Sequence, residues 1–383
     1  MDVLARLQQA PGAEVVLGAV ADEPGVHVVG GAVRDALLDH VPRELDLVVE
    51  GDAAAVARRA AARVGGTVVV HERFGTATVG AGGYLFDLAG ARRERYPRPG
   101  ALPEVTLGAT IAEDLERRDF TVNAIAARLA DGALTVHPGA REDLAAGRLR
   151  VLHDHSFADD PTRLLRLARY AARLGFAAEP HTGELAAAAV AGGAVATVSG
   201  ERLGNELLLL AREPQPEALV ALGRHGLGAA LLPGFEADPA RVRAARDACP
   251  PDARRDLVAL AACCTQVAGL REHLAALGFP ARERDLVVAA ATAPARLGEP
   301  PASDAALWRV LRHEPPEAAA MIGARRWLDD VRHRRLAIGG HDLLAAGVEG
   351  PAVGRGLEAA MVAMLDGAAG DREAQLAAAL SAA

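Results

Sequence analysis

Short apolar runs bounded by glycine recur through the first 140 residues of the chain and are absent beyond about residue 150. Runs of this length between turn residues are typical of β-strands, and they lie at Val26–Val29, Leu45–Val49, Thr67–Val70, Ala77–Gly80 and Leu85–Leu88. One longer segment among them, Ala53–Val64, reads as a helix, and apolar residues with helical spacing dominate the rest of the chain. The pattern predicts an α+β fold, in which a head with a small mixed sheet and covering helices precedes an all-helical arm.

Composition narrows the classes of function. All 42 cationic residues are arginine, so any contact with phosphate must come from arginine, main-chain amides or a metal ion. The net charge of −8 argues against a protein that coats nucleic acid without selectivity, but it allows a local basic groove. The three cysteines are too few and too irregularly spaced for a zinc site. Because we find no signal pattern and no apolar run of membrane-spanning length, we expect a cytoplasmic protein without membrane contact.

An acid–apolar–acid triplet, Glu44–Leu45–Asp46, enters the second predicted strand. Because strand side chains alternate, the two carboxylates point to the same face, roughly 7 Å apart. Acid pairs are often simply screened by water at a surface, but the apolar residues that follow bury this strand and place the acids at an edge or in a cleft. Divalent cations relieve the repulsion between such acids, and a pair of metal ions suits attack at phosphorus. We therefore predict that Glu44 and Asp46 are metal ligands and catalytic residues.

A glycine pair precedes this triplet. Gly30–Gly31 follows the first predicted strand and leads into a helix start at Ala32–Leu38. Main-chain amides at such a turn can approach phosphate closely, and Arg34, one turn into the helix, can add a charge-assisted hydrogen bond. The glycines alone are a weak signal, but the glycine turn, the arginine and the acidic triplet in this order indicate a nucleotide site.

The segments GGAVRD and ELDLVVEGD together resemble the class II tRNA nucleotidyltransferase (CCA-adding enzyme) and bacterial poly(A) polymerase family. The resemblance implies a polymerase-β-like nucleotidyltransferase head, two Mg²⁺ ions, and ATP and CTP as substrates. The family usually has Asp-x-Asp at the triplet, whereas Glu44 takes the first position here and its longer side chain shifts the geometry. Asp87, at the end of a neighbouring predicted strand, is either an auxiliary ligand or a surface acid.

The segment EDLERRDFTVNAIA, residues 113–126, also carries the resemblance. By itself it reads as an amphipathic helix with a charged first half. In the resembling family RRDFTxNA is nearly diagnostic. It implies that Asp119 accepts a hydrogen bond from the ribose, that Arg118 contacts the nucleotide and that Asn123 braces this arrangement.

A third segment, DDPTRLLRLARYAARLGF at residues 159–176, predicts a helix that starts at Pro161 with an aspartate as its cap. The family's acid-Asp-x-x-Arg motif carries over to Asp159, Asp160 and Arg163. Asp160 would accept the exocyclic amine of cytosine or adenine, while Arg163 would donate to the adjacent ring nitrogen. Guanine and uracil present the reverse pattern and would leave polar groups unpaired. Two further arginines on the same side of the helix are expected to hold triphosphate or base: Arg166 and Arg169.

On these grounds we divide the chain into four regions. Residues 1–140 are the nucleotidyltransferase head, 141–205 a helical neck for base recognition, 206–325 a helical body without a motif, and 326–383 a helical tail expected to bind tRNA. His341–Asp342 in the tail lacks the companion residues of a metal phosphohydrolase. The stretch ARRERYPRPGALPEVTLGAT after Asp87 matches by position the flexible loop on which the family's step from C to A depends, and its prolines should keep it extended. A solvated linker is an equal alternative.

The resulting hypothesis is template-independent addition of C and A to the 3′ end of tRNA. The terminal hydroxyl would attack the α-phosphorus of CTP or ATP, and pyrophosphate would leave. The alternatives are a split enzyme that adds only CC or only A, a poly(A) polymerase, and a non-catalytic RNA-binding module for which Glu44 is the only support. The expected partners are the tRNA 3′ end, ATP and CTP, and we expect a monomer.

Overall fold

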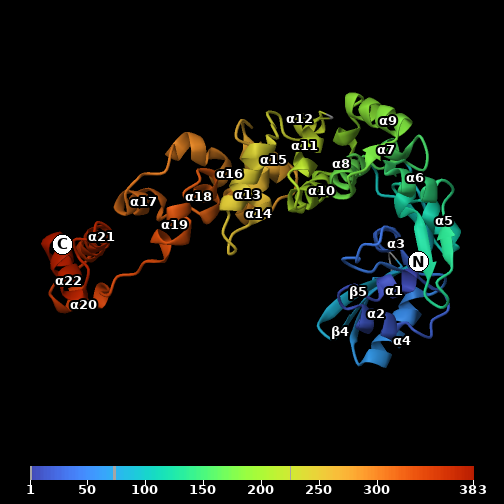
Figure 1. The fold of residues 1–383 in the computed structure, drawn as a ribbon, viewed down its shortest axis with the longest axis horizontal. Helices are drawn as coiled ribbons and strands as arrows, with labels where there is room; N and C mark the ends of the chain where they lie inside the picture. Colours follow the sequence, from blue (N-terminus) through green and yellow to red (C-terminus); the bar gives the residue numbers. More distant parts are fainter. Residues whose placement is uncertain (1, 72–74, 225) are drawn as a thin grey trace. The chain divides into compact units, whose positions relative to one another are not determined.

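The computed structural model describes residues 2–71, 75–224 and 226–383, which fold into two compact units, Met1–Ser199 and Gly200–Ala383 (Figure 1). The first unit contains a mixed sheet with helices and the second is helical, so the predicted fold class is confirmed. The predicted neck–body boundary at residue 205 falls inside helix α10 (Gly200–Arg212). The division into head, neck, body and tail remains a prediction.

Seven strands form the main sheet in the order β3–β4–β5–β2–β1–β8–β9. Every neighbouring pair is antiparallel except β2 and β5, which are parallel. Strand β1, between β2 and β8, is buried along its whole length, as an apolar run between two partners requires. The strands are β1 (Val26–Val29), β2 (Leu47–Val49), β3 (Thr67–His71), β4 (Thr76–Ala81), β5 (Tyr84–Gly90), β8 (Ile125–Arg128) and β9 (Leu134–Val136).

Two predicted elements differ from the structure. Strand β2 begins at Leu47, so the acidic triplet lies just before it, although the amide of Val29 already donates to the carbonyl oxygen of Asp46. The helix predicted over 113–126 ends at Glu116, because the carboxylate of Asp119 accepts from the next main-chain amide and competes with helical bonding. The chain continues through a 3₁₀ turn, η2 (Thr121–Asn123), into strand β8.

Short helices cover the sheet. Helix α4 packs on β3, β4 and β5 through a stripe of alanines, with Asp52 capping its start and Gly65 in a left-handed conformation at its end. A second apolar cluster joins Val29 and Val48 of the sheet to Ile111 and Leu115 of α5. The helices of this part are α1 (Val3–Leu7), α2 (Ala13–Ala19), α3 (Gly31–Leu37), α4 (Ala53–Val64) and α5 (Ile111–Glu116).

The stretch predicted as an extended loop after Asp87 is instead a β-hairpin, β6 (Arg92–Arg95) and β7 (Glu104–Leu107). Its connection contacts the helical part of the same unit, because the amide of Gly100 donates to the carbonyl oxygen of Ala158, 3.1 Å away. The prolines lie in this connection rather than in the paired strands, where they could not donate to the ladder.

The helical part of the first unit presents α8 (Thr162–Leu174), in which Arg163 and Arg169 are buried together with the apolar side chains. The remaining elements are α6 (Ala140–Ala146), β10 (Arg148–Leu149), α7 (Ser156–Asp159), β11 (Ala177–Ala178), α9 (Pro180–Ala191) and η3 (Ala194–Thr197).

The described residues of the second unit are helical. Helix α14 is buried from Asp256 to Cys263, and the three cysteine side chains are buried, as expected of reduced core residues. A separate small core around Leu343, Ala360 and Ala379 joins the last three helices. Among the described residues, no helix combines the length and apolar character needed to cross a membrane. The helices after α10 are α11 (Glu217–Arg224), α12 (Leu227–Leu231), α13 (Pro239–Ala248), α14 (Arg255–Cys263), α15 (Leu270–Ala276), α16 (Ala281–Leu297), α17 (Asp304–Leu311), α18 (Pro316–Met321), α19 (Arg325–Asp329), η4 (Val331–His333), α20 (Gly340–Ala345), α21 (Pro351–Leu365) and α22 (Arg372–Ser381).

Candidate active site

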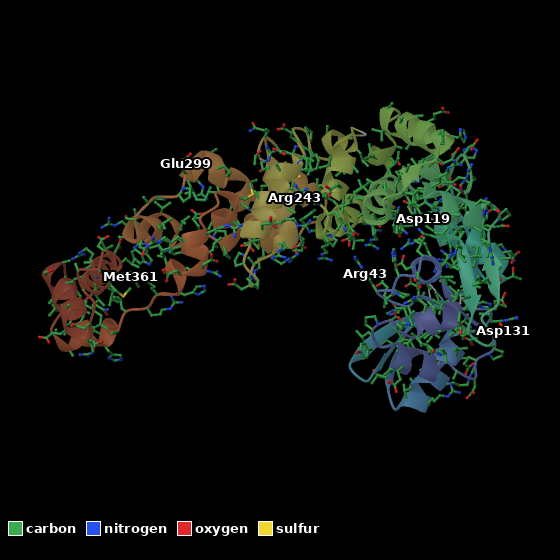
Figure 2. All side chains as sticks on the ribbon, viewed as in Figure 1. Arg43, Asp119, Asp131, Arg243, Glu299 and Met361 are labelled. Atoms are coloured by element: carbon green, nitrogen blue, oxygen red, sulfur yellow. The ribbon has the colours of Figure 1, made fainter. Side chains whose placement is uncertain are left out.

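A cavity of about 230 Å³ in the first unit brings the three sequence motifs together. The predicted site residues that line it are Gly30, Gly31, Asp46, Arg118, Asp119, Asn123, Asp160, Arg163 and Arg166. The lining residues that the sequence analysis missed are Glu94, Tyr96, Arg117 and Tyr170. The predicted site residues outside the lining are Arg34, Glu44 and Arg169. Asp119 is labelled in Figure 2.

Asp46 borders this cavity and also a second one of about 410 Å³, whose lining includes Glu44, Asp87 and Arg43 (labelled in Figure 2). Burial raises the pKa of Asp46 above its ordinary value, and the negative charge of Glu44 raises the pKa further. A divalent cation would relieve this repulsion, so the pair fits a metal site. Asp87 accepts a hydrogen bond from the hydroxyl of Thr78 at 2.6 Å. Within the described ranges, no three His, Cys, Asp or Glu side chains converge as a metal-binding group.

The glycine turn lies between two guanidiniums. Gly30 has a φ of +68°, and a Cβ there would stand 2.9 Å from a terminal nitrogen of Arg118, so this position requires glycine. Arg34, expected to bind phosphate, is only 1% exposed. It donates to Asp35 and, at 2.6 Å, to the side-chain oxygen of Asn123. In this structure Arg34 supports the glycine turn through these hydrogen bonds and does not line the cavity.

Asp119 is the most heavily bonded carboxylate of the cavity. Its Oδ1 accepts from the amide of Phe120 at 2.8 Å and from Asn123 at 2.9 Å. Its Oδ2 accepts from two nitrogens of Arg166, at 2.8 and 2.7 Å. Burial opposes ionisation, but the charge of Arg166 and these hydrogen bonds outweigh it and lower the pKa of Asp119 to about 2. The four donors fill the lone-pair positions of the carboxylate.

The proposed base readers are held from the protein side. Oδ1 of Asp160 accepts from the amide and the hydroxyl of Thr162, two residues further on, just ahead of α8, whose N-cap residue is Pro161. Arg163 donates from one terminal nitrogen to the hydroxyl of Ser156, at 2.6 Å, and from the other to the carbonyl oxygen of Arg117, at 2.8 Å. Both side chains line the cavity. Because these hydrogen bonds hold them, their orientation is fixed before a ligand binds.

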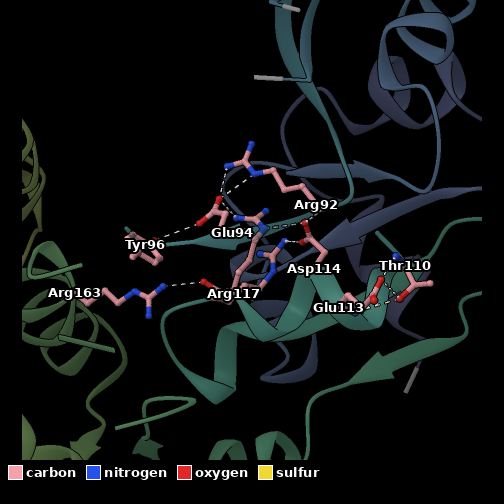
Figure 3. Close-up of polar contacts among 9 residues, drawn as sticks. Arg92, Glu94, Tyr96, Thr110, Glu113, Asp114, Arg117 and Arg163 are labelled. Atoms are coloured by element: carbon pink, nitrogen blue, oxygen red, sulfur yellow. Dashed lines mark hydrogen bonds and ion pairs between the residues drawn. The ribbon is translucent and has the colours of Figure 1, made fainter. Parts of the chain in front are cut away.

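Glu94 connects the β6–β7 hairpin to this wall (Figure 3). Its side chain is 6% exposed and accepts from Arg92 and from Arg117, the latter at 3.0 Å. Its second oxygen accepts from the hydroxyl of Tyr96 at 3.3 Å. Burial is the main cause that raises the pKa of Tyr96 to about 12. The mixed charges of RRERY were the only sequence signal for this cluster.

Arg117 and Arg118 share a buried acid on the same wall. Both arginines pair with Asp114, whose side chain is fully buried and whose Oδ1 also accepts from the amide of Arg92. Although burial favours the neutral acid, the charges of the two arginines lower the pKa of Asp114. A carboxylate that remains charged therefore fixes two guanidiniums beside the cavity.

Comparison with known proteins agrees with this geometry. Residues 26–150 match the family model of the poly A polymerase head domain. The chain is 45% identical over 179 residues to the A-adding tRNA nucleotidyltransferase of Halalkalibacterium halodurans, which covers 45% of this chain and 42% of that protein. It is 43% identical over 207 residues to the CC-adding tRNA nucleotidyltransferase of Deinococcus radiodurans, covering 52% and 54% of the two chains. The chain thus spans about half the length of these curated relatives or less.

Solved structures extend the likeness over the whole chain. A CCA-adding enzyme in an apo form superimposes with a TM-score of 0.80 at 26% identity, covering 100% of this chain and 99% of that one. CCA-adding enzymes solved with ATP and with CTP give TM-scores of 0.77 at 27% identity, and cover 96% and 100% of this chain and 94% and 98% of theirs. The Thermotoga maritima enzyme with tRNA_CCA gives 0.74 at 26% identity, covering 100% of this chain and 98% of that one. By its motifs, its cavity and these likenesses, the first unit resembles the head of tRNA nucleotidyltransferases, and the whole chain resembles solved CCA-adding enzymes.

Proposed function

We propose that this chain adds C and A nucleotides to the 3′ end of tRNA without a template and releases pyrophosphate. The observation that carries the proposal is that Asp46 borders the same cavity as Asp160 and Arg163. A pocket with a metal-type acid at one wall and a fixed amine-accepting, nitrogen-donating pair at another suits a nucleotide with a C or A base. Structural neighbours with ATP, CTP and tRNA support this choice of substrates.

Glu44 and Asp46 would hold two Mg²⁺ ions, and bound magnesium would activate the terminal hydroxyl and stabilise charge at the phosphorus. The arginines of the cavity supply the remaining positive charge. Arg118 stands against Gly30, and Arg166 lines the cavity with a side chain that is 32% exposed. Both guanidiniums oppose the rise in the pKa of Asp46. We place the polyphosphate between the glycine turn and these two residues.

Base choice in this proposal rests on Asp160 and Arg163. Cytosine and adenine each offer an amine to Asp160 and a ring nitrogen to Arg163. Guanine and uracil would set a carbonyl oxygen against the carboxylate and an N–H against the guanidinium. Because both side chains are already anchored by the protein, they cannot turn to suit the wrong base without losing those bonds.

The ribose role implied for Asp119 takes a different form here. A ribose hydroxyl could bond to this carboxylate only by displacing one of its four donors. Displacing one donor would leave a polar group without its partner in this site, which costs about 1–3 kcal/mol, and one hydrogen bond to a charged group returns only about 1.5–3 kcal/mol, so the exchange brings little net gain. Asp119 therefore acts on the nucleotide through Arg166, while Arg118 and Asn123 complete this side of the site.

A second candidate is the addition of A alone. Three relatives, at 41–45% identity, are A-adding tRNA nucleotidyltransferases, and each match spans about half of this chain. The base readers accept C and A equally, so they do not discriminate between the two candidates.

One experiment separates the candidates. The purified protein is given Mg²⁺, CTP and ATP with tRNAs that end at the discriminator base, at C or at CC. A complete CCA end on all three tRNAs supports the proposal. Extension of only the tRNA that ends in CC supports the A-adding candidate, and arrest at CC indicates a CC-adding enzyme. Failure to extend any of the three refutes the proposed function.

A further inference from the structure

The ring of Tyr170 lies among arginines at the wall of the cavity. Tyr170 belongs to α8, lines the cavity and is 9% exposed. The guanidinium carbon of Arg169 lies 4.8 Å from the ring centroid, that of Arg34 5.3 Å and that of Arg166 5.6 Å. A fourth, Arg173, lies at 6.0 Å. The edge of Phe120 packs on the same ring, with the centroids 6.0 Å apart.

These guanidiniums have carboxylate partners as well, because Arg34 pairs with Asp35 and Arg166 with Asp119. Arg34 and Arg169 are 1% and 5% exposed, so water screens their charges poorly. The face of an aromatic ring carries partial negative charge and attracts guanidiniums, the more so when both are desolvated. The Tyr170 ring therefore adds to the ion pairs a shared contact that fixes these guanidiniums next to one another.

The contacts of Tyr170 also join two motifs that are far apart in the sequence. Arg34, from α3 beside the glycine turn, donates to Asn123, which donates to Asp119. Asp119 pairs with Arg166, and Arg166 donates to the hydroxyl of Tyr170 at 3.3 Å. The Tyr170 ring in turn contacts Arg34, so these five residues form a closed cycle of contacts. A change at Tyr170 thus acts at once on the glycine turn and on the helix that carries the base readers.

We propose that Tyr170 is a positioning residue that holds the guanidiniums of Arg34, Arg166 and Arg169 together as an anion subsite for a polyphosphate chain. Of these three arginines, Arg166 lines the cavity. Arg34 and Arg169 are buried next to it and contribute to the positive electrostatic potential at the subsite. The identity of the polyphosphate as that of CTP or ATP rests on the proposed function, whereas affinity for polyphosphate itself does not.

The test uses the full chain with Tyr170→Leu and Tyr170→Phe, titrated by calorimetry with inorganic tripolyphosphate, CTP and cytidine. Leucine fills the space without an aromatic face, so the dissociation constants for tripolyphosphate and CTP should rise about tenfold while that for cytidine stays the same. Phenylalanine keeps the ring and loses only the long hydrogen bond to Arg166, so its affinities should stay within about threefold of wild type.

The inference is overturned if Tyr170→Leu binds tripolyphosphate as wild type does, or if cytidine binding weakens by the same factor as CTP binding. Should the leucine variant fail to fold, a ring-fluorinated phenylalanine at position 170 keeps the shape and weakens the face charge. Its affinity for tripolyphosphate should then fall below that of Tyr170→Phe, and equal affinities overturn the inference. If wild type adds no nucleotide to tRNA but the tripolyphosphate result holds, the proposed function fails and the role of Tyr170 stands.

Discussion

Two aspartates that line the same cavity are shifted in opposite directions by their surroundings. Burial and the charge of Glu44 raise the pKa of Asp46, whereas the charge of Arg166 and the hydrogen bonds from Asn123 and Arg166 outweigh burial and lower the pKa of Asp119 to about 2. The first carboxylate gains from a cation supplied by a ligand, and the second already has its cation. Their roles in the proposed site follow from this contrast, because only Asp46 is left to bind a metal.

Replacing Asp46 by asparagine should lower nucleotide addition about a thousandfold, because a metal-held charge is worth several kcal/mol and each factor of ten about 1.4 kcal/mol.

The same Asp46→Asn variant should melt at a higher temperature than wild type when no metal is present. The raised pKa of Asp46 means that the folded state favours the neutral acid, so ionisation at neutral pH reduces stability. Incorporation assays and thermal unfolding measure the two effects. Asp131→Asn, in an exposed turn, is the control for the incorporation assay, and activity of the Asp46 variant within about tenfold of wild type contradicts the ligand role.

Asp119→Asn should reduce the incorporation of ATP and dATP by the same factor, about 10–100, because the acid acts through Arg166. Its effect on stability should depend on pH. A carboxylate whose folded-state pKa is lowered stabilises fully above its unfolded pKa near 4 and loses that contribution as the pH falls to about 2. Denaturant unfolding should thus show a difference from wild type on the order of 2 kcal/mol at pH 6 that shrinks towards pH 3.

A direct ribose contact gives a different result for the same variant. The preference for ATP over dATP would then collapse, whereas positioning through Arg166 leaves that ratio intact. Arg166→Met serves as the companion variant. If the acid and the arginine act as one unit, the double variant should be no worse than either single one.

At the scale of elements, the β6–β7 hairpin links the sheet to the helices within the first unit. Its strand β6 contributes Glu94, which holds Arg117, and the carbonyl oxygen of Arg117 anchors Arg163. At the other end of the hairpin, Gly100 bonds to α7, next to the base-reading motif. The hairpin is thus linked to the segments that carry the proposed base readers at two places, through Arg117 and through Ala158.

Gly100→Ala should loosen this link. Gly100 has a φ of +69°, and a Cβ there would stand 2.3 Å from the hydroxyl oxygen of Thr197 and 2.5 Å from its carbonyl oxygen. Gly108, after the hairpin, has a φ of +80° with nothing within 4 Å, so Gly108→Ala carries only the conformational cost of about 1–2 kcal/mol. The clash should destabilise Gly100→Ala by a further 1–3 kcal/mol or so.

Chemical unfolding measures that difference between the two glycine variants. Competition among all four nucleotides measures base choice, and incorporation of GTP or UTP should rise only in Gly100→Ala. Equal behaviour of the two variants in both assays would show that the docked connection has no influence on the base readers.

At the scale of the whole molecule, every residue that lines the proposed nucleotide cavity belongs to the first compact unit. The second unit contains the helical tail that the sequence analysis expects to bind tRNA. Nucleotide binding and tRNA binding should therefore separate between the two units.

A chain cut after Ser199 should bind CTP and ATP with dissociation constants within about tenfold of the full chain, since a compact unit can fold by itself. It should also lose extension of tRNA, because the proposed tRNA-binding tail is missing. Calorimetry and the extension assay test the two parts, with circular dichroism as the control for folding. A folded fragment that binds neither nucleotide contradicts this division of roles.

Local signals in the sequence were sufficient for much of the fold and for part of the site. Five strands and helix α4 lie where the apolar periodicity predicted them, because that periodicity reports which face of an element is buried. Gly30, Asp46, Asp160 and Arg163 line one cavity, and each belongs to a short motif with a recognisable chemistry. Strands β8 and β9 were missed, because the charged residues that precede β8 read as the start of one long helix.

The partners of these side chains depended on the tertiary structure. Arg34 bonds to Asn123 across 89 residues of sequence, and Asp119 bonds to Arg166 across 47. Glu94 and Tyr170 also line the cavity, although the mixed charges of RRERY were the only sequence signal for Glu94 and none pointed to the ring of Tyr170. A motif fixes which chemical group is present, but its protonation state and remaining hydrogen-bonding capacity depend on neighbours that only folding supplies. The sequence thus determined the type of site and its chemical groups, while packing between distant segments decided which groups face the nucleotide and which brace them.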